Sequence, residues 1–142
     1  NAAISSNSNN VLILNGDTIF ECNFENIFED FLKKESTISI VLNRTKNDRY
    51  GGYKVNKEGF LDLSKKNNTF ISMGATFTKR ELLLNTYQKF KSKKGSFAMM
   101  DEDFISKVSA CPYIINENNS FIDIGTLDSY RESQDIVPLL LS

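Results

Sequence analysis

Two aspartates stand where carboxylates could do chemistry, each at the end of a short apolar segment. Asp17 follows the apolar run Val11–Leu14, and Asp123 lies inside Phe121–Gly125. Ligands of open α/β sheets bind beyond the carboxyl ends of the strands, so both side chains are placed for a site. Two carboxylates that meet there form a ligand set for Mg²⁺, which prefers oxygen and keeps waters and substrate phosphates as its other ligands. Singly, each aspartate is better explained as a turn or cap residue, so the predicted metal site depends on their being paired.

The composition removes several other kinds of catalysis. The chain has no histidine, which excludes Ser-His, Cys-His and zinc-histidine chemistry. Cys22 and Cys111 have no metal-ligand spacing around them, and we interpret both as free thiols in a reducing cytoplasm. The formal net charge is −1 and the basic residues are scattered, so neither nucleic acid nor a membrane is an expected partner. Any catalysis must therefore rest on carboxylates, lysines and a hard cation.

The elements that would position the two aspartates alternate between strand and helix patterns. Val11–Leu14 is a continuous apolar run, which suits a strand covered on both faces, as in a parallel sheet. Asn23 is placed to cap a helix whose apolar residues recur at helical spacing as far as Leu32. Thr37–Leu42 is rich in β-branched residues and predicts the next strand.

The remaining elements continue this alternation. A hairpin is predicted over residues 53–63, around a turn that ends in a glycine. A strand over residues 70–77 leads into a helix, and Thr78 with Glu81 has the pattern of a capping box. The last expected elements are short strands at Tyr113–Ile115 and Phe121–Ile124 and a helix with Thr126 as its N-cap. The chain is thus expected to form one α/β unit.

Two short motifs, about a hundred residues apart, resemble signatures of the sugar-phosphate nucleotidyltransferases. They are Leu14-Asn15-Gly16-Asp17-Thr18 and Phe121-Ile122-Asp123-Ile124-Gly125-Thr126. The segment between them is similar to that family in its order of elements, and the resemblance runs from Val11 to Val137. The nearest likeness is to the heptose or mannose 1-phosphate guanylyltransferases. The resemblance implies a Rossmann-like mixed, mostly parallel sheet with flanking helices, of the nucleotide-diphospho-sugar transferase type.

The resemblance also implies an activity and the residues that would carry it. Enzymes of this family join a nucleoside triphosphate to a sugar 1-phosphate with Mg²⁺ and release pyrophosphate. Their two metal ligands are matched by Asp17 and Asp123. Lysine suits a phosphate as a flexible point charge, but Lys66 beside Lys65 is equally compatible with an exposed loop. The substrate-binding positions that the resemblance implies are Gly16, Gly51, Lys66 and Gly74.

Three positions depart from the family's pattern. Lys65-Lys66 stands where the family usually has Glu-Lys, which removes a carboxylate that would bind sugar hydroxyls. Ser72-Met73-Gly74-Ala75 replaces an Asn-Gly-Gly stretch, and Leu127 replaces a proline after the second motif. These departures leave the sugar open, whereas the choice of base lies largely in the family's N-terminal nucleotide-binding half.

The family's glycine-rich Gly-Gly-x-Gly-Thr-Arg loop, which holds the nucleotide, has no counterpart among the seven glycines. The chain therefore resembles the C-terminal part of such a domain, over residues 11–142, without the N-terminal nucleotide-binding half. Residues 1–10 are small and polar, and look like a tag remnant or a disordered start. We expect the chain alone to be inactive, and its uncovered sheet edge to cause self-association or binding of a partner.

Two other functions fit part of this pattern. A non-catalytic relative would keep the fold as a binding or regulatory module, and the altered Glu-Lys and Asn-Gly-Gly positions favour it. A glycosyltransferase of similar sheet topology would also place an aspartate at a metal beside a nucleotide-sugar. Mg²⁺-dependent release of pyrophosphate would separate the three.

Overall fold

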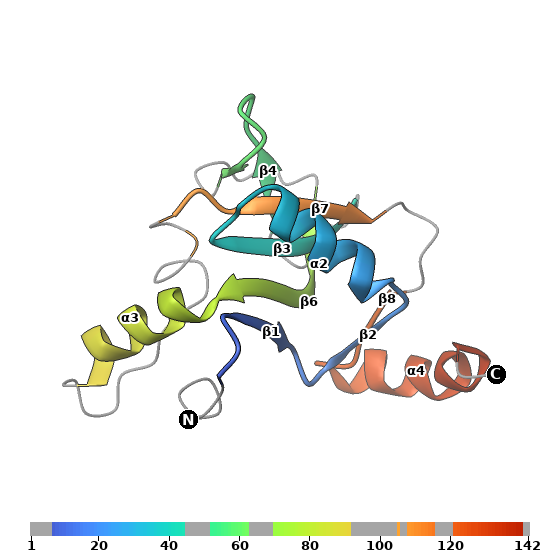
Figure 1. Ribbon diagram of the computed structural model, residues 1–142. Coiled ribbons are helices and arrows are strands. Elements are labelled where there is room, and N and C mark those ends of the chain that lie inside the picture. Colours follow the sequence, from blue (N-terminus) through green and yellow to red (C-terminus); the bar gives the residue numbers. More distant parts are fainter. Residues whose placement is uncertain are drawn as a thin grey trace.

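Residues 7–44, 52–62, 70–91, 105, 108–115 and 121–140 are described by the computed structural model. Their strands and helices follow in the order β1 (Asn10–Leu14), β2 (Thr18–Phe20), α2 (Phe24–Lys33), β3 (Ile38–Arg44), β4 (Lys54–Val55), β5 (Leu61–Asp62), β6 (Phe70–Lys79), α3 (Arg80–Lys91), β7 (Cys111–Ile115), β8 (Phe121–Asp123) and α4 (Leu127–Leu140) (Figure 1). Helices are interspersed among the strands along the chain, so the expected α/β class is confirmed.

The central sheet has the strand order β1-β6-β3-β7 and mixed strand directions. The mixed sheet is as expected, but the parallel pairs that were expected to dominate are a minority among the described strands. β6 runs antiparallel to both β1 and β3, and β3 pairs with β7 in parallel. The reason is the connection between β3 and β6, whose described residues form the β4–β5 hairpin and no helix. A parallel neighbour needs a long crossover, and the chain makes one between β3 and β7 by way of α3.

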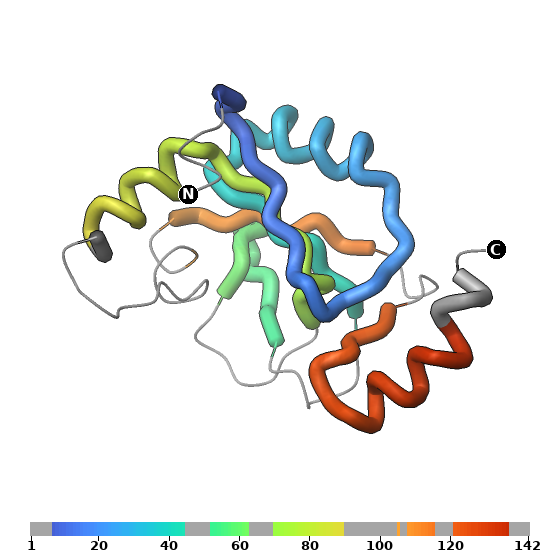
Figure 2. The backbone as a smooth tube through the Cα atoms, turned by 90° about the horizontal axis from the view of Figure 1, so that it is seen from below, coloured from blue at the N-terminus to red at the C-terminus, as the bar shows by residue number. Residues whose placement is uncertain are grey.

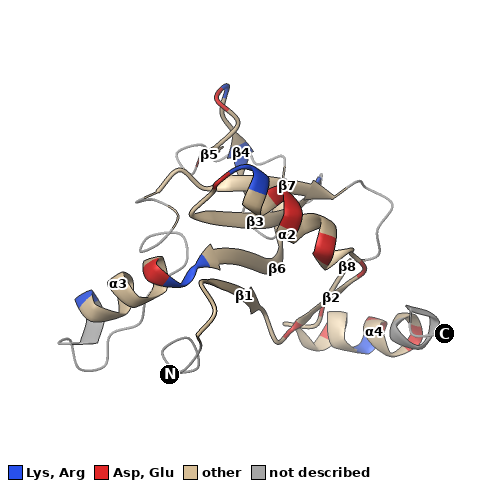
Figure 3. Cartoon of the chain, in the orientation of Figure 1, with Lys and Arg blue, Asp and Glu red and all other residues tan. Residues whose placement is uncertain are grey.

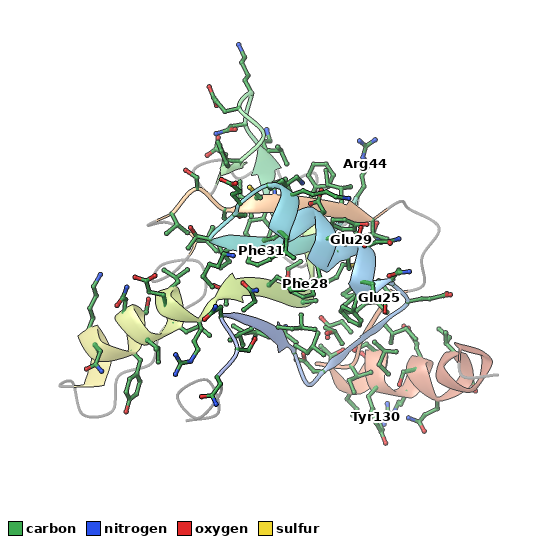
Figure 4. All side chains as sticks on the ribbon, in the orientation of Figure 1. Glu25, Phe28, Glu29, Phe31, Arg44 and Tyr130 are labelled. Atoms are coloured by element: carbon green, nitrogen blue, oxygen red, sulfur yellow. The ribbon has the colours of Figure 1, made fainter. Side chains whose placement is uncertain are left out.

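α2 lies across one face of this sheet and packs with it into one of the two core layers (Figure 1). Asn23 caps the helix as predicted, since its side chain accepts the backbone N–H of Asn26 at 3.0 Å. Acidic residues stand near the start of α2 and basic residues at its end, which suits the helix dipole (Figure 3). Phe28 and Phe31 point from α2 toward the sheet (Figure 4). The buried residues of this layer are Ile27, Phe31, Val41, Met73, Ala75, Phe77 and Ile115.

The opposite face of the sheet is covered by the β4–β5 hairpin and the beginning of α3. The predicted capping box at α3 is wrong. Thr78 is fully buried within β6, and its hydroxyl donates to the Thr37 carbonyl at 3.2 Å, so it cannot cap a helix. β6 continues to Lys79, and α3 begins at Arg80. The buried residues of this second layer are Ile38, Ile40, Leu42, Phe70, Ile105 and Ala110.

β1 forms an edge of the sheet, and its outer side is not paired by any described strand. Seen from below, β1 crosses in front of β6 (Figure 2). The expectation that it is covered on both faces is wrong, because Leu12 is 37% and Leu14 is 53% exposed. Asn9 and Asn10, which precede Val11, also belong to the fold: Asn10 opens β1, and the Asn9 carbonyl accepts the Arg80 N–H at 2.9 Å.

β2 and β8 form a separate antiparallel ribbon between β1 and α4 (Figure 1). α4 packs against β8, and Thr126 caps it as predicted: Ser129 N–H donates to Thr126 Oγ1 at 3.2 Å, and Thr126 N–H donates to Ser129 Oγ at 3.2 Å. Tyr130 points from α4 away from the ribbon (Figure 4). The ribbon therefore joins the end of β1 to the start of α4, and both aspartates lie on it or next to it.

Candidate active site

Asp17 lies in the turn Asn15–Thr18, called here the Asp17 turn, which connects β1 to β2. At its start, Asn15 N–H donates to the Gly74 carbonyl at 2.7 Å. At its end, Thr18 opens β2 and is opposite Asp123 in the ribbon. The Asp17 carbonyl accepts the Ile124 N–H at 2.8 Å, which extends the pairing by one bond beyond the ribbon. Backbone pairing thus brings together two segments that are distant in the sequence.

The two carboxylates face a common point beside Gly125. A Cβ added to Gly125 would lie 2.8 Å from Asp123 Oδ1 and 3.7 Å from Asp17 Oδ2. The two oxygens therefore cannot be farther apart than these two distances together. One Mg²⁺ ion bonds each oxygen ligand at about 2.0–2.1 Å, so the two carboxylates would have to turn toward each other to bind the same ion. The fold brings them near enough for the predicted metal site to be proposed here.

The donor set fits a hard divalent cation. Asp17 is exposed and Asp123 is partly buried, so waters or phosphate oxygens have room to complete a coordination shell. Asp123 Oδ1 accepts the Gly125 N–H at 2.7 Å, which orients this carboxylate and leaves its second oxygen for a ligand. Within the described ranges, His, Cys, Asp and Glu form no group of three or more that could hold a metal. Two carboxylates with open positions suit Mg²⁺ bound together with substrate phosphates.

The start of α4 adds an electrostatic field that favours negative charge. Thr126 caps the helix immediately after Gly125, so the positive end of the helix dipole comes just after Asp123 in the sequence. Backbone N–H groups at a helix N-terminus favour anions such as phosphate. The site combines carboxylates for a cation with a helix start that favours an anion.

Two of the other predicted site residues lie at the Asp17 turn, and two lie outside the described residues. Gly16 is exposed at the tip of the Asp17 turn, and an added Cβ would meet no atom within 4 Å. Gly74 is buried in β6 and lies beneath the same turn, with a positive φ of 78°. Gly51 and Lys66 lie outside the described residues. Within the described part of the chain, Gly16, Asp17, Gly74 and Asp123 therefore gather at one place.

Two residues of the site were not singled out from the sequence. Gly125 was noted as part of a motif, but its role in leaving space for two carboxylates depends on the pairing of β2 with β8. Thr18 has a buried hydroxyl, next to Gly74, that has no hydrogen-bond partner. A glycine two residues after an aspartate was the available signal for Gly125, and Thr18 ends the first motif, but neither signal shows the contacts that these residues make.

The cysteines are free thiols, as predicted. Burial raises the pKa of the Cys22 thiol, which keeps it protonated at neutral pH and makes it a poor nucleophile. Cys111 is buried in β7. Thiolate chemistry is therefore not supported at Cys22.

None of the helices in the described ranges has the length and apolar character needed to cross a bilayer.

Known proteins share this fold. HddC from Yersinia pseudotuberculosis, solved alone and complexed with GMP-PN, is 17% identical with a TM-score of 0.72, over 96% of this chain and 59% of that one. A protein from Bacillus anthracis described as a glucose-1-phosphate thymidylyltransferase, in complex with sucrose, is 11% identical with a TM-score of 0.73. That match covers 95% of this chain and 57% of the other, so the chain spans less than two thirds of either structure.

No curated protein sequence matches the chain significantly. The family model described as nucleotidyl transferase matches residues 1–138, which is nearly the whole sequence. The expected family is thereby confirmed, together with the mixed α/β architecture shared with the solved structures. The chain belongs to the nucleotidyl transferase family.

Proposed function

We propose that this chain carries the metal-binding part of a sugar-1-phosphate nucleotidyltransferase, which makes a nucleotide-sugar from a nucleoside triphosphate. The observation that carries the proposal is the meeting of Asp17 and Asp123 at Gly125. These carboxylates would hold Mg²⁺, with substrate phosphates as its remaining ligands. The bound ion would neutralise triphosphate charge and polarise the phosphoryl group under attack.

In the proposed reaction, an oxygen of the sugar 1-phosphate attacks the α-phosphorus of the nucleotide in line. The new oxygen–phosphorus bond forms as the bond from the α-phosphorus to its bridging oxygen breaks, and pyrophosphate leaves. Asp17 and Asp123 would act by holding and orienting the charged groups, which is the main catalytic task in phosphoryl transfer. Gly16 at the tip of the Asp17 turn, Gly51, Lys66 and Gly74 are the proposed substrate-binding positions.

The ligands of two structural neighbours support the substrate class. HddC is complexed with GMP-PN, a nucleotide, and the Bacillus anthracis protein is complexed with a sucrose. We infer a nucleoside triphosphate and a sugar 1-phosphate as substrates, with a guanine nucleotide favoured by the resemblance to guanylyltransferases. The absence of a disulfide among the described cysteines fits the proposed cytoplasmic location.

The open edge of β1 also bears on the proposed function. Its outer backbone groups are unpaired by the described strands, and Leu12 and Leu14 are exposed beside them. An apolar strand edge of this kind pairs readily with another strand. We propose that a strand from a second copy, or from another partner, covers β1, and that the 142-residue chain alone transfers nucleotide poorly.

The test is an assay of Mg²⁺-dependent pyrophosphate release. It is run with a nucleoside triphosphate and a sugar 1-phosphate on this chain and on the product of the full open reading frame that encodes it. The expected result is release by the full product that requires both substrates and Mg²⁺, and that is lost in Asp17→Asn. Binding of Mn²⁺ and of sugar phosphate without any release would instead support the non-catalytic relative. Hydrolysis of a nucleotide-sugar without pyrophosphate chemistry would support the glycosyltransferase.

A further inference from the structure

Gly74 interrupts the regular pairing of β6 at the point where the Asp17 turn crosses it. The register between β3 and β6 shifts between Ile40 and Leu42, so β6 bulges there. Gly74 has a φ of +78°, a conformation that residues with a side chain rarely adopt. Its N–H donates to Ser72 Oγ at 3.1 Å, and its carbonyl accepts the Asn15 N–H at 2.7 Å. The bulge therefore directs a backbone acceptor to the start of the Asp17 turn.

The space where Gly74 lacks a side chain is occupied by the Asp17 turn. A Cβ at this position would collide with Thr18 Oγ1 and lie 2.9 Å from Asn15 Cβ. The Thr18 hydroxyl is buried without a hydrogen-bond partner among the described residues, so it is held against Gly74 by packing. Asn15 and Thr18 are the two ends of the turn that carries Asp17. Both ends are thus held by one glycine.

We propose that Gly74 is a positioning residue, which acts through Asn15 and Thr18 to set the place of the Asp17 carboxylate relative to Asp123. The inference deepens the proposed function and rests on it for the catalytic meaning of the two aspartates. Thr18 is opposite Asp123 in the ribbon, so a shift of Thr18 changes the separation of the two carboxylates. Gly74 itself is buried, so this positioning effect passes through the turn that it supports and is separate from the substrate contact proposed for Gly74 above.

Gly74→Ala is the direct test, and the chain provides a matched control. Gly59 also has a positive φ, of 87°, but a Cβ there would meet no atom within 4 Å. Gly59→Ala therefore introduces the same kind of backbone strain without a collision. A difference between the two variants reports the contact with the Asp17 turn and not the strain.

A second pair of variants approaches the contact from the other side, in case Gly74→Ala does not fold. Thr18→Ala removes the hydroxyl that packs on Gly74, and Thr18→Ser keeps it. Neither changes the backbone conformation of Gly74. Since the hydroxyl has no hydrogen-bond partner, its removal is not expected to unfold the chain.

Two measurements on the full chain separate this inference from the proposed function. The first is hydrogen exchange of the Ile124 amide, which donates to the Asp17 carbonyl and needs no metal. Relative to amides of the β3–β7 pairing, its protection should fall about tenfold or more in Gly74→Ala and Thr18→Ala, but not in Gly59→Ala or Thr18→Ser. The second is Mn²⁺ affinity, which should fall by about 10–100-fold in the first two variants, as for other residues that orient metal ligands.

Unchanged Ile124 protection in Gly74→Ala overturns the inference, whatever the metal result. If Gly74→Ala does not fold, equal protection in Thr18→Ala and Thr18→Ser overturns it instead. If the protection changes as expected but the parent chain binds no Mn²⁺, the positioning contact stands and the proposed metal site fails.

Discussion

Gly125 lies next to both carboxylates of the candidate site. Its backbone N–H donates to one oxygen of Asp123, and the absence of a Cβ leaves room for this carboxylate beside Asp17. A residue of any other type at this position must displace the Asp123 carboxylate, because an added Cβ would lie 2.8 Å from its oxygen. At the scale of single residues, we expect the proposed site to need this glycine as well as the two acids.

Gly125→Ala should therefore leave the chain folded while it weakens metal binding. The colliding atom is the end of a side chain, which can rotate away, so the melting temperature should change little. Rotation breaks the hydrogen bond from the Gly125 N–H and moves a ligand, and we expect about 10–100-fold weaker Mn²⁺ binding. The measurement is a titration followed by the electron paramagnetic resonance signal of free Mn²⁺, with a thermal melt of each protein. Gly59→Ala serves as the control, and equal affinities of the two variants would contradict the role given to Gly125.

At the scale of elements, the N-terminal cap of α2 shows how one residue of the sequence stabilises a helix. The Asn23 side chain accepts the Asn26 N–H, one of the donors that the start of a helix leaves unpaired. Asn23→Ala should lower the free energy of unfolding by about 1 kcal/mol. Asn26→Ala keeps the same backbone donor, and should change stability by less than about 0.5 kcal/mol. Urea denaturation compares the two, and equal losses of stability would show that the cap contributes nothing.

The elements that the sequence predicted well are those whose signals are local. The cap and spacing of α2, the β-branched run of β3, the hairpin, and Thr126 before α4 are all visible in a few consecutive residues. Thr78 misled the prediction because a distant carbonyl, that of Thr37, takes its hydroxyl. The exposure of β1 and the direction of β6 were not predictable from local patterns, because both depend on which strands become neighbours.

The candidate site was also predictable only in part. Strand ends marked Asp17 and Asp123, and the family's motifs suggested that they meet. The contact between Gly74 and the Asp17 turn was not visible, since it arises from a bulge in β6 and from β1 pairing alongside. The roles of Gly51 and Lys66 stay predictions.

At the scale of the whole molecule, the open edge of β1 is the feature that we expect to govern association in solution. Leu14 is 53% exposed at this edge, next to backbone groups that no described strand pairs. We expect the chain to self-associate, and Leu14→Lys to shift it toward the monomer, because a charge on an edge strand opposes pairing. Sedimentation velocity over a range of concentrations measures this.

The matched control is Leu127→Lys, which places the same charge on α4 at a residue that is 64% exposed. It should leave the association unchanged, since it does not alter the sheet edge. A stable, compact monomer of the unaltered chain at high concentration would count against association through β1.

The proposed function requires that Asp17 and Asp123 bind one divalent cation together. Titration of Mn²⁺ into the chain and its variants, followed by electron paramagnetic resonance, tests it most directly. We predict one site in the unaltered chain, at least about tenfold weaker binding in both Asp17→Asn and Asp123→Asn, and unchanged binding in Asp135→Asn, an exposed acid farther along α4. A chain without a site, or a site that survives the loss of either aspartate, would contradict the shared metal centre.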